Sequence, residues 1–309
     1  MYAGPTIVDV SDVMIERAAV VALLRSPGAS WSHVAAEVLD RGSAVSLLRE
    51  PSGQQDILAD PDAALEDAVA EVRAWESAGI GVHCVLDASY PALLRDIRER
   101  PPLLFSRGQL ADDVRAIAVV GSRAASDRAC DIAGAIAAEL VARRVTIVSG
   151  LAAGIDTAAH HGALAAGGRT VAVIGTGVDQ TYPSTNRPLQ QRIATEGLVL
   201  SQFWPDAPPR REHFPMRNAV MSGYSAATVV VEAGEHSGVR IQARLALQHG
   251  RQVIVRKELL ELEWVRHLAT RPGVHVSASL EELVNAVDDV LRQRDVLLSG
   301  REGIAGLFS

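Results

Sequence analysis

The sequence predicts an α/β fold, in which a parallel sheet is covered by helices on both faces and preceded by a small helical N-terminal domain. Two observations predict it. From Ile117 onward, short β-branched runs recur at regular intervals, and helical patterns lie between them. Before residue 80, by contrast, apolar residues repeat at helical spacing. Alternating strands and helices favour a parallel sheet whose ligands bind at the carboxyl ends of the strands.

Residues 1–80 are predicted to form the helical domain, of a SAM-like or helix-hairpin-helix-like type. The segment VMIERAAVVALL and residues 31–39 and 63–75 have helical periodicity, with turn residues such as 51–53 between them. The turn at 26–28 could contact a DNA backbone, as helix-hairpin-helix turns do. It lacks the paired glycines that allow such close approach, so packing is the favoured interpretation.

Residues 81–112 are predicted to be a connector, with a strand at 81–86 and one short helix. The sheet domain is expected at 113–293. Ser279 and Glu282 form a capping box for a last helix that ends near Gln293, and residues 294–309 are expected to be a flexible tail. The strands of the sheet are predicted at 117–120, 145–148, 170–174, 198–201, 227–231, 252–255 and 274–276.

Composition narrows the class of protein. No apolar run approaches the roughly 18 residues of a membrane span, and the first residues lack the features of a secretory signal. We therefore expect a cytoplasmic protein that does not enter a membrane. Cys84 and Cys130 have no metal-ligand spacing, so both are predicted to be small buried hydrophobes without a disulfide.

The charge is unevenly distributed along the chain. The net charge is -7, yet the stretch from Asp113 to Arg256 has 15 Arg against 11 Asp plus Glu, a balance of +4. Arginine suits phosphate binding and base stacking. The middle of the chain is therefore predicted to bind an anion.

Three strand-to-helix turns are candidates for that anion. In VTIVSGLAAGIDTAAH (145–160) a strand stops at Ser149-Gly150 and a helix starts after Gly154, which leaves backbone N–H groups for an anion; close packing is an equally good explanation. The other two turns are Gly121-Ser122-Arg123 and Gly175-Thr176-Gly177. No dinucleotide fingerprint and no P-loop occurs.

Aromatic and basic residues concentrate after the fourth strand. Bases stack on aromatic rings at roughly 1–3 kcal/mol each, and arginines can follow phosphates, so nucleic-acid recognition is favoured over mere anchoring of the loop. Glu232, after the fifth strand, could bind a ribose or base edge, or pair with Arg217. The concentrated residues are Phe203, Trp204, Phe214, Arg210, Arg211 and Arg217.

Catalytic signals are weak. His160 and His161 share a helix without a nearby ligand set and are interpreted as structural, and Asp156 is interpreted as a helix N-terminal residue that the dipole favours. No GxSxG, HExxH or CxxC motif occurs. The sequence therefore predicts no catalytic residue, no metal site and no cofactor.

Several motifs in fixed order resemble the DprA/Smf family of DNA-processing proteins. They are VVGSRAAS (119–126), SGLAAGIDTAAH (149–160), GGRTVAVIGTGVDQTYP (167–183), FPMRN (214–218) and VVVEAGEHSG (229–238), preceded by YPALLRDIRERPPLLFSRG (90–108). The resemblance covers about residues 80–256. It implies a Rossmann-like domain and a non-enzymatic single-stranded DNA-binding protein. Such proteins protect incoming DNA in natural transformation, load RecA and form homodimers.

Carried onto matching positions, the resemblance implies a DNA pocket. Arg123 and Arg217 would contact phosphates, and bases would stack on Phe214. The residues of the pocket would be Ser122, Arg123, Ser149, Gly150, Gly175, Gly177, Phe214, Arg217, Asn218, Glu232, Ser237 and Gly238.

Departures from the family pattern suggest a diverged member. Ala153 and Ala219 stand where the family has arginines, Gln202 replaces a carboxylate, Gln242 replaces a threonine, and residues 255–257 replace a proline-glycine step. These changes imply weaker or altered DNA binding. Many relatives also carry a C-terminal winged-helix domain, which this chain is expected to be too short to hold.

Two other functions remain open. One is a nucleotide-ligand sensor or nucleotide N-glycosidase of the related lysine-decarboxylase-like group, in which Glu232 would contact ribose. The PGGxGTxxE motif of those enzymes is missing. The other is an interaction protein whose pocket has decayed.

Overall fold

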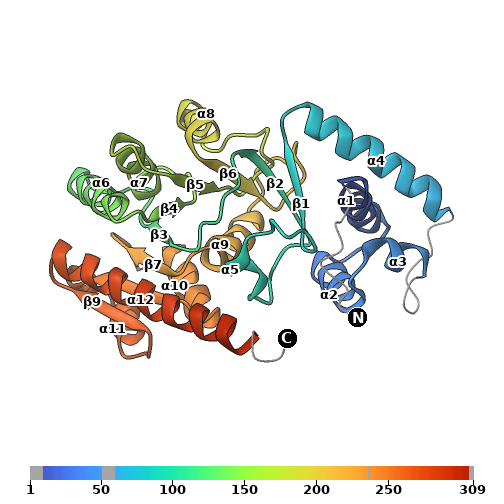
Figure 1. The fold of residues 1–309 in the computed structure, drawn as a ribbon. Helices are drawn as coiled ribbons and strands as arrows, with labels where there is room; N and C mark the ends of the chain where they lie inside the picture. The colour runs from blue at the N-terminus through green and yellow to red at the C-terminus, as the bar shows by residue number, and fades with distance from the viewer. Residues whose placement is uncertain (1–9, 51–59, 236, 306–309) are drawn as a thin grey trace.

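A computed structural model describes residues 10–50, 60–235 and 237–305 (Figure 1). A helical region comes first in the chain, and a mostly parallel sheet with helices on both faces follows it. The predicted fold class is therefore confirmed. The predicted turn at 51–53 lies outside the described residues.

The N-terminal region contains four helices before the sheet. The predicted helices at 31–39 and 63–75 correspond to the second and fourth of them. Asp60 caps the fourth helix by accepting hydrogen bonds from the N–H groups of Asp62 and Ala63, and Pro61 occupies its first turn. The four helices are α1 (Val10–Arg25), α2 (Trp31–Arg41), α3 (Ala44–Arg49) and α4 (Pro61–Ser77).

The sheet has the order β1-β2-β6-β5-β4-β3-β7-β8-β9. The last seven strands in the chain are mutually parallel and match the seven predicted ones to within one or two residues, whereas β1 and β2 pair antiparallel. The strands are β1 (Gly81–Cys84), β2 (Leu103–Gly108), β3 (Ala116–Val120), β4 (Thr146–Ser149), β5 (Thr170–Val173), β6 (Leu198–Ser201), β7 (Ala227–Val230), β8 (Gln252–Arg256) and β9 (Val274–Ser277).

Strand β2 was not predicted from the sequence. Pro101 and Pro102 precede it directly, which argues against a strand. The pairing of Phe105 with both Val82 and Ser201 nevertheless fixes it between β1 and β6. The segment 81–112, expected to be a connector, thus contributes two strands to the sheet as well as its one short helix, α5 (Ala92–Arg95).

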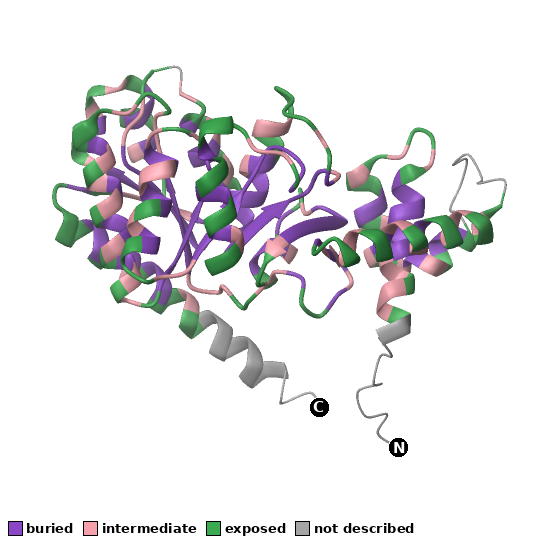
Figure 2. Ribbon diagram, turned by 90° about the horizontal axis from the view of Figure 1, so that it is seen from above, coloured by how far each residue is buried: buried purple, intermediate pink, exposed green. Residues whose placement is uncertain are grey.

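Helices cover both faces of the sheet, and alternate residues of a strand face opposite sides. Ile117 and Val119 of β3 pack in one apolar cluster with α6, α7 and α12, while Ala118 and Val120 pack in the other with α9 and α10. The central strands, β3 to β7, are buried between these layers (Figure 2). The helices are α6 (Asp127–Ala142), α7 (Ile155–Ala165), α8 (Arg187–Glu196), α9 (His213–Tyr224), α10 (Val239–Gln248), α11 (Glu263–Ala269) and α12 (Leu280–Ala305), with short 3-10 turns at Ser184–Asn186 and Lys257–Glu261.

The last helix is longer than expected. The capping box is confirmed, since Ser279 accepts from the Glu282 N–H and Glu282 accepts from the Ala278 N–H. The helix then continues to Ala305, well into the segment 294–309 that was expected to be a flexible tail. No proline interrupts this stretch, so nothing in the chain stops the helix near Gln293.

A topological switch point lies at β3, which pairs with β4 on one side and β7 on the other. The chain leaves these neighbouring strands toward opposite faces of the sheet. In open parallel sheets such a point opens a crevice at the carboxyl ends of the strands. The turn after β3 and the turn after β7 border this crevice.

The helical region packs against the β1–β2 end of the sheet through an aromatic cluster. The Trp204 ring lies 5.4 Å from Trp31, 5.8 Å from Trp75 and 5.7 Å from Phe105, between centroids, and the Arg25 guanidinium lies 4.0 Å above it. Trp204 thus anchors its loop to the helical region. The interpretation of Trp204 as a base-stacking residue is wrong, because its ring is already covered.

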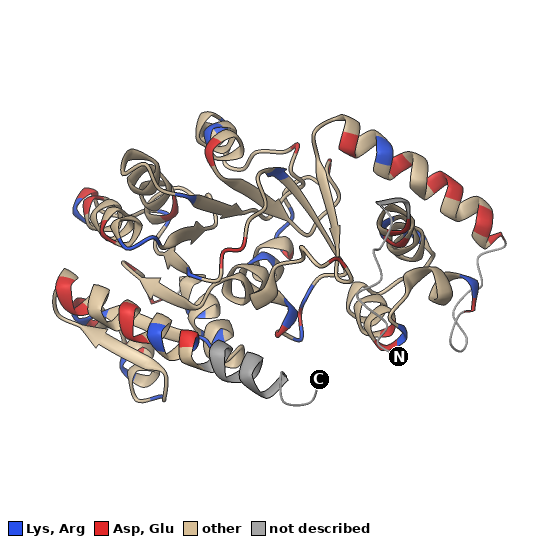
Figure 3. Ribbon diagram, in the orientation of Figure 1, with Lys and Arg blue, Asp and Glu red and all other residues tan. Residues whose placement is uncertain are grey.

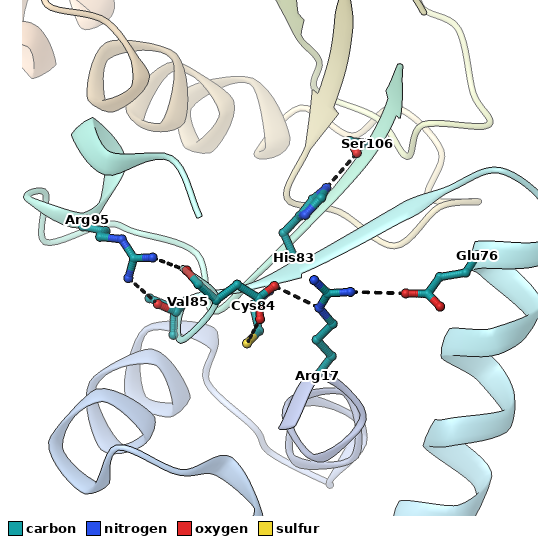
Figure 4. A network of polar contacts seen from close by, with 8 residues as sticks. Arg17, Glu76, His83, Cys84, Val85, Arg95 and Ser106 are labelled. Atoms are coloured by element: carbon teal, nitrogen blue, oxygen red, sulfur yellow. Dashed lines mark hydrogen bonds and ion pairs between the residues drawn. The ribbon is translucent and has the colours of Figure 1, made fainter. Parts of the chain in front are cut away.

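A polar network reinforces this junction (Figure 4). Arg17 of α1 donates to Asp87 at 2.9 Å and to Glu76 of α4 at 3.3 Å, and Asp87 also accepts from the Cys84 N–H and thiol. Burial lowers the pKa of His83 to about 4 and raises the pKa of the Cys84 thiol to about 12. The prediction that Cys84 is buried is confirmed, whereas Cys130 is half-buried.

Two helices carry many acidic residues. Acidic residues are spaced along α4 and along the first turns of α12 (Figure 3).

Among the residues that the structure describes, no helix is long and apolar enough to cross a membrane.

Candidate nucleic-acid interface

Two adjoining cavities open at the carboxyl ends of the strands. The larger has a volume of about 570 Å³ and is bordered by the turns after β3 and β7 and by the first turns of α9 and α10. The smaller, of about 130 Å³, is bordered by the turns after β4 and β5. Both are lined by Arg123, Ala152, Phe214 and Arg217. These four residues therefore form the boundary between them.

Nine of the twelve predicted site residues line a cavity. Three do not: Ser149, Gly177 and Glu232. The smaller cavity adds Gly150 and Gly175 to the shared residues, and the larger is lined by Ser122, Arg123, Phe214, Arg217, Asn218, Ser237 and Gly238.

Arg123 is the exposed cation of the boundary. It follows β3 directly, and its guanidinium carbon lies 5.0 Å from the centroid of the Phe214 ring. This cation–π contact holds a flexible side chain at the mouth of both cavities. Within the described parts of the chain, no carboxylate forms a salt bridge with Arg123. Its charge is available to an anionic ligand.

Arg217 is a buried cation beneath both cavities. Its residue is 4% exposed, and Nη1 donates to the Val173 carbonyl at 3.0 Å. Burial lowers the pKa of Arg217, and the charge of Asp156 opposes that shift. The backbone passes close to this side chain only because residue 150 is glycine, since a Cβ there would overlap the guanidinium. Phosphate contact by Arg217 stays a prediction.

The predicted anion-binding turn after β4 already holds an anion. Asp156, in the first turn of α7, accepts hydrogen bonds from the N–H of Gly150 at 3.1 Å and of Ala152 at 3.4 Å. Burial raises the pKa of Asp156, while Arg217 and these N–H donors oppose the shift. The turn does have the expected chemistry. The Gly150 N–H already donates to the chain's own carboxyl group, and contact of Gly150 with DNA stays a prediction.

The three predicted residues outside the cavities have structural partners. The buried Ser149 hydroxyl donates to the Val119 carbonyl at 2.6 Å. A Cβ at Gly177 would overlap the backbone carbonyls of the 204–205 segment, so this glycine permits close packing of that loop.

Glu232 holds Ser126, the N-cap residue of α6, rather than pairing with Arg217. Its carboxylate accepts from the Ser126 N–H at 3.2 Å and from the Ser126 hydroxyl at 2.8 Å. Ser126 in turn accepts from the Ala129 N–H. Glu232 therefore joins the turn after β7 to the helix after β3 and stabilises both sides of the crevice.

Of the aromatic residues concentrated in 203–214, Phe214 lines the cavities, and it lies in the first turn of α9. Phe203 is buried and stacks on His213 with a centroid distance of 3.9 Å, so its assignment to base stacking is wrong for the same reason as that of Trp204. The Phe214 ring packs over Gly175. A Cβ added at residue 175 would lie about 3.0 Å from the ring.

Tyr182 and Gln242 also line the cavities, although neither was among the predicted site residues. Tyr182 is 48% exposed and its ring centroid lies 5.6 Å from that of Phe214. Gln242 is buried at the wall of the larger cavity, and its Oε1 has no hydrogen-bond partner among the described residues. The available signal for Tyr182 was its place in the motif GGRTVAVIGTGVDQTYP (167–183), five positions after Gly177.

Exposed arginines lie in or just before the helices that border the larger cavity. Arg210 and Arg211 precede α9, and Arg240 lies in the first turn of α10. None of the three forms a salt bridge within the described residues. Such a set attracts a polyanion through sequence-independent electrostatics. The basic balance predicted for the middle of the chain is thus partly displayed around the cavities.

The fold and the site together define a Rossmann-like domain with a strand-end pocket and a basic rim. Comparison with known proteins is more specific. The family model described as DNA recombination-mediator protein A matches residues 81–289, and the chain belongs to this family of DprA/Smf DNA-processing proteins.

Individual relatives agree. The chain is 45% identical over 175 residues to DNA processing protein DprA of Streptococcus pneumoniae, which covers 55% of this chain and 60% of that protein. It is 42% identical over 172 residues to protein Smf of Synechocystis, covering 54% of this chain and 43% of that protein. The matched region thus spans about half the length of these relatives.

Solved structures show the same fold. The crystal structure of Streptococcus pneumoniae DprA matches with a TM-score of 0.69 and 32% identity, over 87% of this chain and 97% of that one. DNA processing protein A of Helicobacter pylori, studied for its single-stranded DNA binding mode, matches with a TM-score of 0.61 and 24% identity, over 69% of this chain and 96% of that one.

Proposed function

We propose that this protein binds single-stranded DNA at the two strand-end cavities, without catalysing a reaction, and acts as a recombination mediator. The observation that carries the proposal is Arg123, an exposed cation held over the Phe214 ring at the boundary of both cavities. The single-stranded DNA binding mode of the Helicobacter pylori relative supports it.

The geometry suggests how a strand binds. Phosphates pair with Arg123, which lacks a salt bridge within the described residues and so has no competing carboxylate there. A base stacks on the partly exposed Phe214 ring. Arg217 adds positive charge from below, part of which the facing carboxyl group of Asp156 compensates. These contacts read backbone charge and ring faces, so the binding has little sequence preference.

Two further properties are proposed from membership of the family. The protein passes bound DNA to RecA, as the description of the family as a recombination mediator supports. It also acts as a homodimer. Light scattering with length-graded oligo-dT tests the second point, because a dimer that binds one strand doubles the protein mass per complex. A monomeric mass with and without DNA would contradict it.

Replacing Arg123 tests the site directly. Arg123→Ala removes one charge-assisted phosphate contact, so affinity for oligo-dT should fall by roughly tenfold, equivalent to about 1.5 kcal/mol. Removing one neutralised phosphate should also make the slope of log K against log salt shallower by about 0.7. Fluorescence anisotropy over a salt titration measures both quantities.

Arg271→Ala is the matched control. Arg271 is equally exposed but precedes the amino end of β9, at the opposite edge of the sheet from the cavities. It should leave affinity and salt slope unchanged. If Arg123→Ala binds like the parent across the titration, the site is misplaced.

The mononucleotide alternative relied on Glu232 to contact a ribose. That function is less favoured, because the Glu232 carboxylate is hydrogen-bonded to Ser126. A thermal-shift comparison separates the alternatives. Oligo-dT should raise the melting temperature, whereas free mononucleotides should not. Stabilisation by mononucleotides alone would favour the sensor or glycosidase function, and stabilisation by neither would favour an interaction protein.

A further inference from the structure

Tyr182 is the one aromatic residue among the exposed large apolar side chains of the described chain. It lies in the segment between β5 and the 3-10 turn at Ser184–Asn186, and its ring is tilted by 52° to that of Phe214 at a centroid distance of 5.6 Å. A half-exposed tyrosine residue beside a second ring leaves apolar surface in water. The arrangement is typical of a surface that a flat ligand covers.

The smaller cavity has the size and lining of a site for one ring. Its volume of about 130 Å³ is close to that of the cavity, roughly 150 Å³, that takes up a benzene molecule in an engineered protein. Gly150, Ala153, Gly175 and Pro183 supply its small apolar walls, with Tyr182 and Phe214 as the aromatic ones. Arg123 and Arg217 are its only charged lining residues.

The larger cavity differs in chemistry. Ser122, Asn218, Ser237 and Gln242 contribute polar side chains to its wall. Polar groups of this kind suit sugar and phosphate oxygens, whereas the smaller cavity suits the face of a base. Phe214 borders both, so a strand that crosses it would place backbone on one side and a base on the other.

We propose that one base of a bound single strand stacks on the exposed ring of Tyr182, which forms an aromatic platform together with the tilted Phe214 ring beside it, and that the smaller cavity is the subsite for that base. This inference rests on the single-stranded DNA binding proposed above. It assigns Tyr182 a binding role through its ring, and it makes the hydroxyl group dispensable.

Two variants and an abasic scan test the platform. Tyr182→Ala should weaken oligo-dT binding by about 5- to 150-fold, the range measured for removal of a base-stacking ring, while Tyr182→Phe should stay close to the parent. In the parent, replacing one nucleotide at a time by an abasic residue should reveal a position with a loss of similar size. In Tyr182→Ala, an abasic residue at that position should reduce affinity only slightly, because the ring on which the base stacks has already been removed.

If Tyr182 has a purely structural role, the two changes should not be coupled. The abasic replacement should then reduce affinity by the same factor in the parent and in Tyr182→Ala. That result, or parental affinity of Tyr182→Ala for intact oligo-dT, would overturn the platform while leaving DNA binding in place. Failure of the parent itself to bind oligo-dT would overturn both proposals.

Discussion

Asp113→Ala should lower the free energy of unfolding by about 3–5 kcal/mol, the range for removing one partner of a buried ion pair. The Asp113 carboxylate accepts from the Thr146 hydroxyl at 2.7 Å, from Arg169 at 2.7 and 2.9 Å, and from the Tyr224 hydroxyl at 2.5 Å. Its side chain is 4% exposed. Alanine would leave two hydroxyls without this acceptor, and the Arg169 guanidinium would retain its hydrogen bond to the Gln109 carbonyl but lose both of those to the carboxylate.

The effect is large because Asp113 joins four elements. It precedes β3, Thr146 begins β4, Arg169 precedes β5, and Tyr224 ends α9. Urea denaturation measures the loss, with Asp112→Ala as the control, since Asp112 is its exposed neighbour and should change stability by less than about 0.5 kcal/mol. Asp113→Asn keeps the acceptor oxygen and should lose less. Equal stability of the Asp112 and Asp113 alanine variants would rule out the network as a stabilising feature.

His160→Asn should make stability less sensitive to acid. His160 is fully buried, and Thr170 donates to the Ile147 carbonyl, so the Thr170 hydroxyl accepts the proton of His160 Nδ1 at 2.7 Å. Burial, helped by the nearby charges of His161 and Arg217, lowers the pKa of His160 to about 3. The residue is structural, as the sequence analysis favoured, and it is neutral in the folded chain.

The direction of the pH effect follows from linkage. The unfolded chain protonates this histidine below about pH 6.5 and the folded chain does not, so stability is full above pH 6.5 and falls as the pH drops toward 3. Between pH 7.5 and 4.5 the parent should lose about 2–3 kcal/mol more than His160→Asn. Urea unfolding at both pH values checks this. His161→Asn, an exposed neighbour on the same helix, should behave like the parent, and equal acid losses in parent and His160→Asn would contradict the assignment.

Much of the sheet could be predicted from the sequence because its strands are buried on both faces. Segments such as Thr170–Val173 and Ala227–Val230 are short runs of β-branched and small residues between turn residues, a local signal that needs no knowledge of partners. The turns after β3, β4, β5 and β7 followed from the same reasoning. Parallel strands present their carboxyl ends at one edge, so these turns had to meet there.

The sequence could not reveal the hydrogen-bond partners of the polar side chains. Glu232 and Ser126 are far apart in the chain, and nothing local distinguishes a cap from a ligand-binding carboxylate. Asp156 was placed correctly at the start of a helix, but its hydrogen bonds to the Gly150 turn depend on how that helix packs. The aromatic concentration in 203–214 was real, yet three-dimensional packing divided it between the core, the helical region and the cavities.

Trp204 has a consequence for how the protein can be shortened. A fragment that starts at Gly81 would keep every strand of the sheet and every residue that lines the two cavities. It would also uncover the rings of Trp204 and Phe105, which Trp31 and Trp75 now cover. Such a contiguous apolar surface promotes self-association. The boundary between helices and sheet is therefore a poor place to cut the chain. The helical region α1–α4 holds in place the loop that leads into Phe214.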